Sequence, residues 1–97
     1  MAELFKSDTF DVWLRDLRDR AGRSRVLVRI ERLAAGNPGD VKAVGGGVSE
    51  MRIAFGPGYR VYYTTRGPLV IVLLAGGDKS TQAEDIAEAK RIAQEWE

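Results

Sequence analysis

The sequence predicts an α+β fold in which two N-terminal helices pack on a small, mainly antiparallel sheet with a C-terminal helix. Three observations predict it: two amphipathic segments near the start, a run of alternating and continuous apolar segments in the second half, and a last amphipathic segment. The extended segments follow one another without an intervening helix, which is typical of a meander of three or four strands. With 97 residues, the chain is expected to form one domain, residues 1–97, with a modest core.

The first half of the chain predicts a short strand and two helices. Residues 4–6 are expected to be extended, and Ser7 or Asp8 then caps a helix whose apolar stripe is Phe10, Trp13, Leu14 and Leu17. That helix is expected to end near Gly22. A second helix, residues 24–35, has an apolar side made by Val26, Leu27, Ile30, Leu33 and Ala34. The two helices are expected to form a helical hairpin.

The second half predicts strands joined by glycine-rich turns, and then a helix. Residues 40–44 form a short extended piece, and residues 45–47 connect it to a hairpin. Residues 69–75, LVIVLLA, are a continuous apolar run, which predicts a central strand covered on both faces. Residues 81–84 match a capping box, and the helix after it has a stripe of Ile86, Ala89, Ala93 and Trp96.

The hairpin from Ser49 to Tyr63 says most about function. Its period-2 alternation is interrupted by Gly-Pro-Gly at 56–58, which predicts a three-residue loop with Phe55 opposite Tyr59 and Arg52 opposite Tyr62. One face is then apolar, made by Met51, Ile53, Phe55, Tyr59, Val61 and Tyr63. The other face carries Glu50, Arg52, Arg60, Tyr62 and Thr64.

The polar hairpin face, with Lys79 after the apolar strand, has the composition of a site for an RNA phosphodiester. In metal-free RNA cleavage the ribose 2′-OH attacks the adjacent phosphorus, and the guanidinium groups of Arg52 and Arg60 suit the charge that develops. Glu50, Lys79 and Tyr62 are the candidate proton acceptors. The sequence has no histidine and no cysteine, which excludes an imidazole base, a thiolate nucleophile and a zinc knuckle.

Each of these side chains also has a simpler explanation. Glu50 and Arg52 are two apart on one strand face, as in a surface ion pair. Tyr62 has the spacing of a residue that packs on the sheet, and Lys79 lies near a helix start, where a cation is poorly placed against the helix dipole. Arg60 follows the tight turn directly and is the residue for which a functional role is favoured most.

The charge of the chain is unevenly distributed. The net charge is only +1, but residues 1–66 carry 12 Lys and Arg against 8 Asp and Glu, whereas residues 67–97 carry 3 against 6. Arginines gather in the two predicted helices, mostly off the apolar stripes, and the expected RNA-binding set is Arg15, Arg18, Arg25, Arg29 and Arg32. A solvated helix face would explain the same pattern.

Other functional classes find little support. The glycines at 45–47 lack the spacing of a phosphate-binding loop, residues 76–80 resemble such a loop only superficially, and no dinucleotide-binding pattern occurs. The longest apolar run is too short to span a bilayer, so a soluble, cytoplasmic protein without a membrane partner is expected.

Three stretches resemble a known family. They are FDVWLRDLRDR near the start, GNPGDVKAVGGGVSEMRIAFGPGYRVYY in the middle, and LLAGGDKSTQAEDIAEAK near the end. In this order and spacing they resemble the RelE/ParE superfamily of bacterial type II toxins, particularly its HigB-like, phage Gp49-like "addiction module killer" branch. The resemblance covers nearly the whole chain.

The resemblance implies an α+β toxin that cleaves messenger RNA on the ribosome, needs no cofactor, and is neutralised by an antitoxin resembling a helix-turn-helix protein. By position, Arg52, Arg60 and Lys79 match the basic residues of the family best. The chain departs from RelE in offering Asp85 where RelE has a tyrosine. Two other functions stay open within this resemblance: a ParE-like inhibitor of DNA gyrase, and a non-catalytic module that binds RNA or the ribosome.

Overall fold

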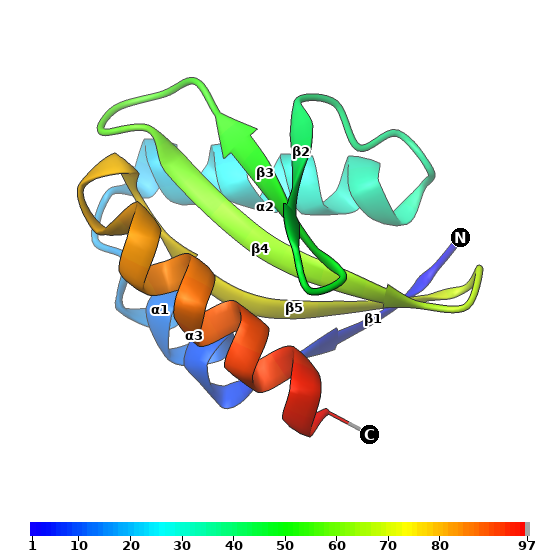
Figure 1. Ribbon diagram of the computed structural model, residues 1–97. Coiled ribbons are helices and arrows are strands. Elements are labelled where there is room, and N and C mark those ends of the chain that lie inside the picture. Colours follow the sequence, from blue (N-terminus) through cyan, green and yellow to red (C-terminus); the bar gives the residue numbers. More distant parts are fainter. Residues whose placement is uncertain (97) are drawn as a thin grey trace.

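The computed structural model of this chain describes residues 1–96 and has a five-stranded sheet with helices on both faces (Figure 1). Its elements are, in order, β1 (Glu3–Lys6), α1 (Asp8–Asp16), α2 (Arg20–Ala34), β2 (Val41–Gly45), β3 (Val48–Ile53), β4 (Tyr59–Arg66), β5 (Val70–Gly77), the 3₁₀ turn η1 (Lys79–Thr81) and α3 (Gln82–Glu95). The strand order is β1-β5-β4-β3-β2, and every pair is antiparallel except β1 with β5. The predicted α+β class is therefore confirmed.

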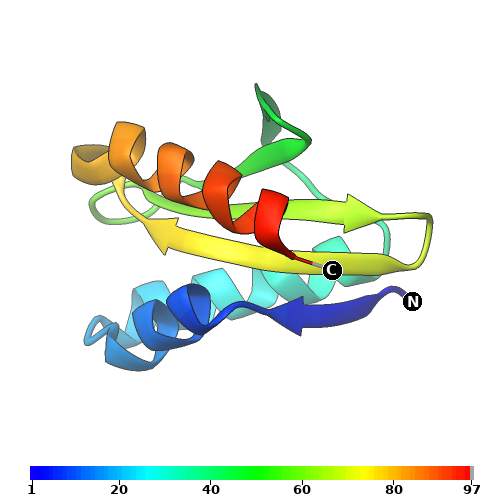
Figure 2. The same cartoon turned by 60° about the horizontal axis from the view of Figure 1, so that its bottom comes forward.

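The sheet separates two cores. Helices α1 and α2 cover one face and α3 covers the other (Figure 2). Contrary to the expected helical hairpin, α1 packs mainly on β5 and α2 on β3 and β4, because each apolar stripe faces the sheet. Strand β5 is covered on both faces as predicted: Ile71 and Leu73 belong to the α1/α2 core, and Val72 and Leu74 to the α3 core. The middle strand of the sheet, however, is β4.

The helix starts are set by side-chain caps. The Ser7 hydroxyl accepts the backbone N–H of Phe10 at 3.0 Å, which makes Ser7 the cap of α1. The prediction that Gly22 ends this helix is wrong. Asp19 caps α2 by accepting the N–H of Gly22 at 3.0 Å, so Gly22 lies inside α2. A Cβ at Gly22 would overlap the Tyr59 ring, so this glycine permits close packing and does not terminate a helix.

The capping box predicted at residues 81–84 does not form. The Thr81 hydroxyl donates to Asp85 at 2.5 Å and accepts no backbone N–H of α3. The turn η1 precedes α3, and Asp78 caps that turn by accepting the N–H of Ser80 at 2.8 Å. The apolar stripe of α3 is confirmed, with Ala89 and Ala93 buried against the sheet.

The hairpin has the predicted faces but a different register. Ile53 pairs with Tyr59 and Arg52 with Arg60, so the connecting loop spans residues 54–58 and the predicted three-residue loop is wrong. Because the register differs by two residues, every side chain stays on its predicted face. Phe55 lies in this longer loop and not in the strand. Arg25 Cζ lies 4.7 Å from the centroid of the Phe55 ring.

Tyr59 links the start of β4 to the cap of α2. Its hydroxyl donates to Asp19 Oδ2 at 2.7 Å, and this hydrogen bond, with burial, raises the pKa of Tyr59 from 10.0 to about 12. Between these values the folded state holds a proton that the unfolded state has lost. The free energy of unfolding should therefore fall as the pH rises from 10 toward 12.

Replacing Tyr59 by Phe should remove this part of the pH dependence. At pH 9 we expect Tyr59→Phe to be less stable than the native chain by about 1 kcal/mol, as for a partly screened hydrogen bond to a charge. Urea unfolding at several alkaline pH values should show this difference shrinking as the pH approaches 12. A difference that stays constant over this range would contradict the assignment.

Candidate functional site

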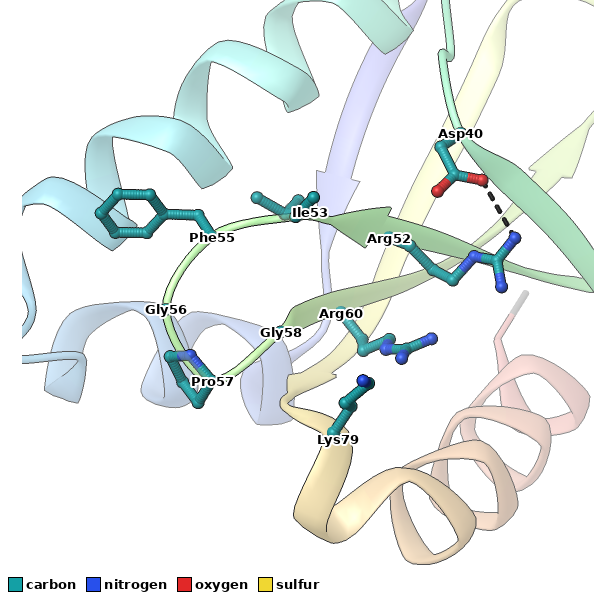
Figure 3. Close-up of a pocket in the computed structure, with 10 residues that line it drawn as sticks. Asp40, Arg52, Ile53, Phe55, Gly56, Pro57, Gly58, Arg60 and Lys79 are labelled. Atoms are coloured by element: carbon teal, nitrogen blue, oxygen red, sulfur yellow. Dashed lines mark hydrogen bonds and ion pairs between the residues drawn. The ribbon is translucent and has the colours of Figure 1, made fainter.

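A cavity of about 520 Å³ opens beside the 54–58 loop, and three cationic side chains point into it (Figure 3). Arg52 comes from β3, Arg60 from β4 and Lys79 from η1, so three separate elements supply the charge. The wall is completed by Asp40 and by the loop residues Ile53, Ala54, Phe55, Gly56, Pro57 and Gly58. We call this cavity the hairpin pocket. The structure thus brings together three of the residues predicted for the site.

The two arginines of the hairpin pocket lie directly opposite each other on β3 and β4. Like charges in this position repel unless they are compensated. Arg52 Nη2 lies 3.0 Å from Asp40 Oδ1, and Arg60 Nη1 lies 3.0 Å from Glu50 Oε1. The Nε–H of each arginine is buried and has no acceptor among residues 1–96. Each guanidinium is therefore held by one carboxylate and keeps donors that the described protein does not use.

The polar hairpin face is partly covered by α3. Glu50 is only 1% exposed, and its carboxylate accepts from Arg60, from the Tyr62 hydroxyl at 3.0 Å and from Gln82 Nε2 at 2.9 Å. Tyr62 is fully buried, and burial together with the hydrogen bond to Glu50 raises its pKa. The surface ion pair considered for Glu50 and Arg52 does not form, because Glu50 pairs with Arg60. Glu50 and Tyr62 lie beneath the pocket and do not line it.

Lys79 is exposed at the mouth of the hairpin pocket. Its stem passes over Gly58, where a Cβ would lie 3.2 Å from Lys79 Cγ. Gly58 has a φ of 81°, which an L side chain adopts only with strain. No carboxylate among residues 1–96 forms an ion pair with Lys79. The ammonium is therefore free within the described chain to contact an anion.

The sequence interpretation missed Asp40, the carboxylate that lines the hairpin pocket. Its side chain is 60% exposed and reaches Arg52 because the Arg52 N–H donates to the Asp40 carbonyl at 2.9 Å, in line with the β2–β3 ladder. Pairing the extended piece at 40–44 with the hairpin strand would have indicated this contact. Asp40 adds an accessible proton acceptor to the site.

Asp85, at the position where the resemblance implied a departure, lies outside the lining of the hairpin pocket. Burial raises the pKa of this carboxyl, whereas its hydrogen bond from Thr81 acts in the opposite direction. A Cβ on Gly77 would overlap the Asp85 carboxylate, so the glycine at the end of β5 makes room for it. Asp85 is a packed residue at the start of α3.

The five predicted RNA-binding arginines separate into two groups. Arg25, Arg29 and Arg32 line a second cavity of about 470 Å³ together with Val28, Ile53 and Ala54, which we call the α2 groove. Arg15 pairs with the neighbouring Asp16 at 3.6 Å, and Arg18 is exposed between α1 and α2. Arg15 and Arg18 line neither cavity.

Arg29 also has a structural role that the sequence did not indicate. Its Nη1 donates to the Arg52 carbonyl at 2.7 Å, and its Nη2 donates to the Pro38 carbonyl at 3.0 Å. These bonds tie α2 to β3 and to the connection before β2. Arg29 therefore positions the edge of the hairpin pocket while its charge faces the α2 groove.

Two features are absent from residues 1–96. No helix in residues 1–96 is both long and apolar enough to cross a membrane. These residues also contain no cluster of three or more acidic, histidine or cysteine side chains that could hold a metal ion.

Comparison with known proteins gives two matches. The family model described as "Phage derived protein Gp49-like" matches residues 12–97. A protein of Haemophilus influenzae, described as an uncharacterized protein, is 48% identical over 87 residues, which cover 90% of this chain and 88% of the relative.

Proposed function

The chain belongs to the Gp49-like family of phage-derived proteins, within the RelE/HigB-like group of toxins, and we propose that it is an mRNA-cleaving toxin. In this proposal it is the toxin of a type II toxin–antitoxin pair and acts on the translating ribosome. Its partners are the messenger, the ribosome and a cognate antitoxin. Family membership supports the assignment as a toxin. The geometry of the hairpin pocket supports RNA cleavage.

One observation supports RNA cleavage above the others: Arg52, Arg60 and Lys79 converge on the hairpin pocket beside the exposed carboxylate of Asp40. A phosphodiester held there would meet cations from β3, β4 and η1. When a ribose 2′-oxygen attacks the phosphorus, negative charge builds up on the non-bridging oxygens, and preorganised guanidinium donors stabilise that charge.

We propose proton-transfer roles on the basis of side-chain exposure. Asp40 accepts the proton of the attacking 2′-OH, because it is the accessible carboxylate of the pocket. Glu50 is buried, and its carboxylate already accepts three hydrogen bonds. The bond from phosphorus to the 5′-oxygen then breaks, and Lys79 supplies the proton to that leaving oxygen. The products are a 2′,3′-cyclic phosphate and a 5′-hydroxyl end.

The ribosome supplies positioning in this proposal. Holding the 2′-oxygen in line with the scissile bond can contribute about 7–11 kcal/mol, which a small site without histidine needs. Free RNA is therefore expected to be cut poorly compared with a messenger on the ribosome.

The test is a map of 5′-hydroxyl ends of cellular RNA shortly after induced expression. We expect the native chain to produce new ends inside translated codons, and Asp40→Asn to reduce them about 100-fold or more. The matched control is Asp16→Asn, because Asp16 is also an exposed carboxylate beside an arginine but lies outside the pocket. It should produce as many ends as the native chain.

Other outcomes would overturn the proposal in whole or in part. Toxicity without new 5′-hydroxyl ends would favour inhibition of DNA gyrase. Salt-sensitive binding to ribosomes without cleavage would favour a non-catalytic RNA-binding module. Full cleavage by Asp40→Asn would remove Asp40 from the mechanism while leaving the cleavage itself established.

A further inference from the structure

The α2 groove and the hairpin pocket are neighbours with a common wall. Ile53 and Ala54 line both cavities. Phe55, which also lines the hairpin pocket, carries the Arg25 guanidinium 4.7 Å above its ring, so Arg25 connects the two cavities. A ligand that leaves the hairpin pocket across the start of the 54–58 loop therefore enters the α2 groove.

The α2 groove has the less compensated charge. Its three arginines form no ion pair with any carboxylate among residues 1–96, whereas Arg52 and Arg60 each have one. Arg29 is fixed by backbone carbonyls, which orient the guanidinium without neutralising it. An anion should therefore be attracted more strongly to the α2 groove than to the hairpin pocket beside it.

Two of the three arginines are also preorganised. Arg25 is stacked on Phe55 and Arg29 is held by two carbonyls, so little side-chain freedom is lost when a phosphate binds. Val28, which is 43% exposed, gives the groove an apolar patch between the charges. A concave, cationic groove with an apolar patch suits a single nucleic acid strand.

We infer that the α2 groove binds the backbone of the same single-stranded RNA that is cut in the hairpin pocket, at phosphates next to the scissile one. This inference rests on the proposed function and goes beyond it. It separates two tasks: Arg25 and Arg32 hold the strand, and the pocket performs the chemistry. It also assigns these arginines to the messenger strand and not to a ribosomal RNA duplex.

Binding of RNA that cannot be cut tests this inference independently of catalysis. The probe is a fluorescent single-stranded decamer with 2′-O-methyl riboses, titrated by anisotropy at several salt concentrations. We expect Arg25→Gln/Arg32→Gln to lower the affinity about tenfold and to reduce the slope of log K against log salt by about 1.4, since each phosphate contact to a single strand contributes about 0.7. The matched control is Arg20→Gln/Arg23→Gln, which removes the same charge from the same helix at two positions that line neither cavity. It should leave the slope unchanged.

Three outcomes would overturn the inference. Equal slopes for the two variants would show that the groove makes no specific phosphate contacts. Loss of binding only to an RNA hairpin of the same length would assign the groove to duplex RNA, and no binding of the native chain to the decamer would exclude a strand-holding role. A further outcome separates the two proposals. If Arg25→Gln/Arg32→Gln loses affinity and its control does not, but the native chain yields no 5′-hydroxyl ends in cells, then the α2 groove binds single-stranded RNA and the proposed cleavage is wrong.

Discussion

Arg60→Lys is expected to lower cleavage of ribosome-bound messenger by about 100- to 1,000-fold while the domain stays folded, as when one preorganised donor is removed from a transition state. Arg60 is only 8% exposed, and Nη1 of its guanidinium is engaged by Glu50. A planar guanidinium can bond Glu50 and a phosphate oxygen at the same time. A lysine ammonium is a point charge that cannot reproduce this fork, so it satisfies Glu50 at the expense of the phosphate.

The measurement is single-turnover cleavage, with urea unfolding of the same preparation as the check on folding. Arg66→Lys is the matched control, because Arg66 lies at the far end of β4 and donates to the Ala93 carbonyl of α3, away from the pocket. It should retain native cleavage. If Arg60→Lys cuts within threefold of the native rate, Arg60 is a structural residue and the pocket's chemistry lies elsewhere.

Glu50→Ala is expected to lower the free energy of unfolding by about 3–5 kcal/mol, because removing one partner of a buried ion pair leaves the other charge uncompensated. The loss here involves three donors, since Arg60, Tyr62 and Gln82 all bond to this carboxylate. Such a change is a large fraction of the total stability of a small domain.

The measurement is urea unfolding at neutral pH, with two comparisons. Glu50→Gln keeps an acceptor oxygen and should cost less than Glu50→Ala. Glu50→Leu/Arg60→Met removes both charges and should recover part of the loss, although Tyr62 and Gln82 still lack their acceptor. A loss below about 1 kcal/mol for Glu50→Ala would show that the network is not held together as described.

The sequence allowed the faces of the hairpin to be predicted, but not what covers them. Alternation assigns Met51 and Glu50 to opposite faces whatever the loop length, because side chains on a strand alternate. The sequence favours a solvent-exposed polar face, because Glu50, Arg60 and Tyr62 carry polar groups that are seldom buried together. They are buried because their polar groups bond one another, and such pairing depends on contacts across strands that periodicity cannot reveal.

The missed features of the site also depend on long-range contacts. Asp40 lies in the pocket because β2 pairs with β3. Arg29 reaches the Arg52 carbonyl because α2 packs on the sheet. Asp40 does not stand out in the sequence, and nothing there separates the structural role of Arg29 from the RNA-binding role predicted for it among the seven arginines between residues 15 and 32. The convergence of Arg52, Arg60 and Lys79, in contrast, followed from strand order and a resemblance in spacing.

The parallel pairing of β1 with β5 has a consequence for the order in which the domain assembles during synthesis. Ser7 donates to the Leu74 carbonyl across 67 residues, so the first strand has no partner until β5 has been made. The antiparallel strands β2 to β4 can pair earlier, but β4 gains its second neighbour only with β5. Lys79 follows β5 directly. A nascent chain that stops within β5 lacks both the completed sheet and the third cation of the pocket, so toxicity should require translation past Lys79.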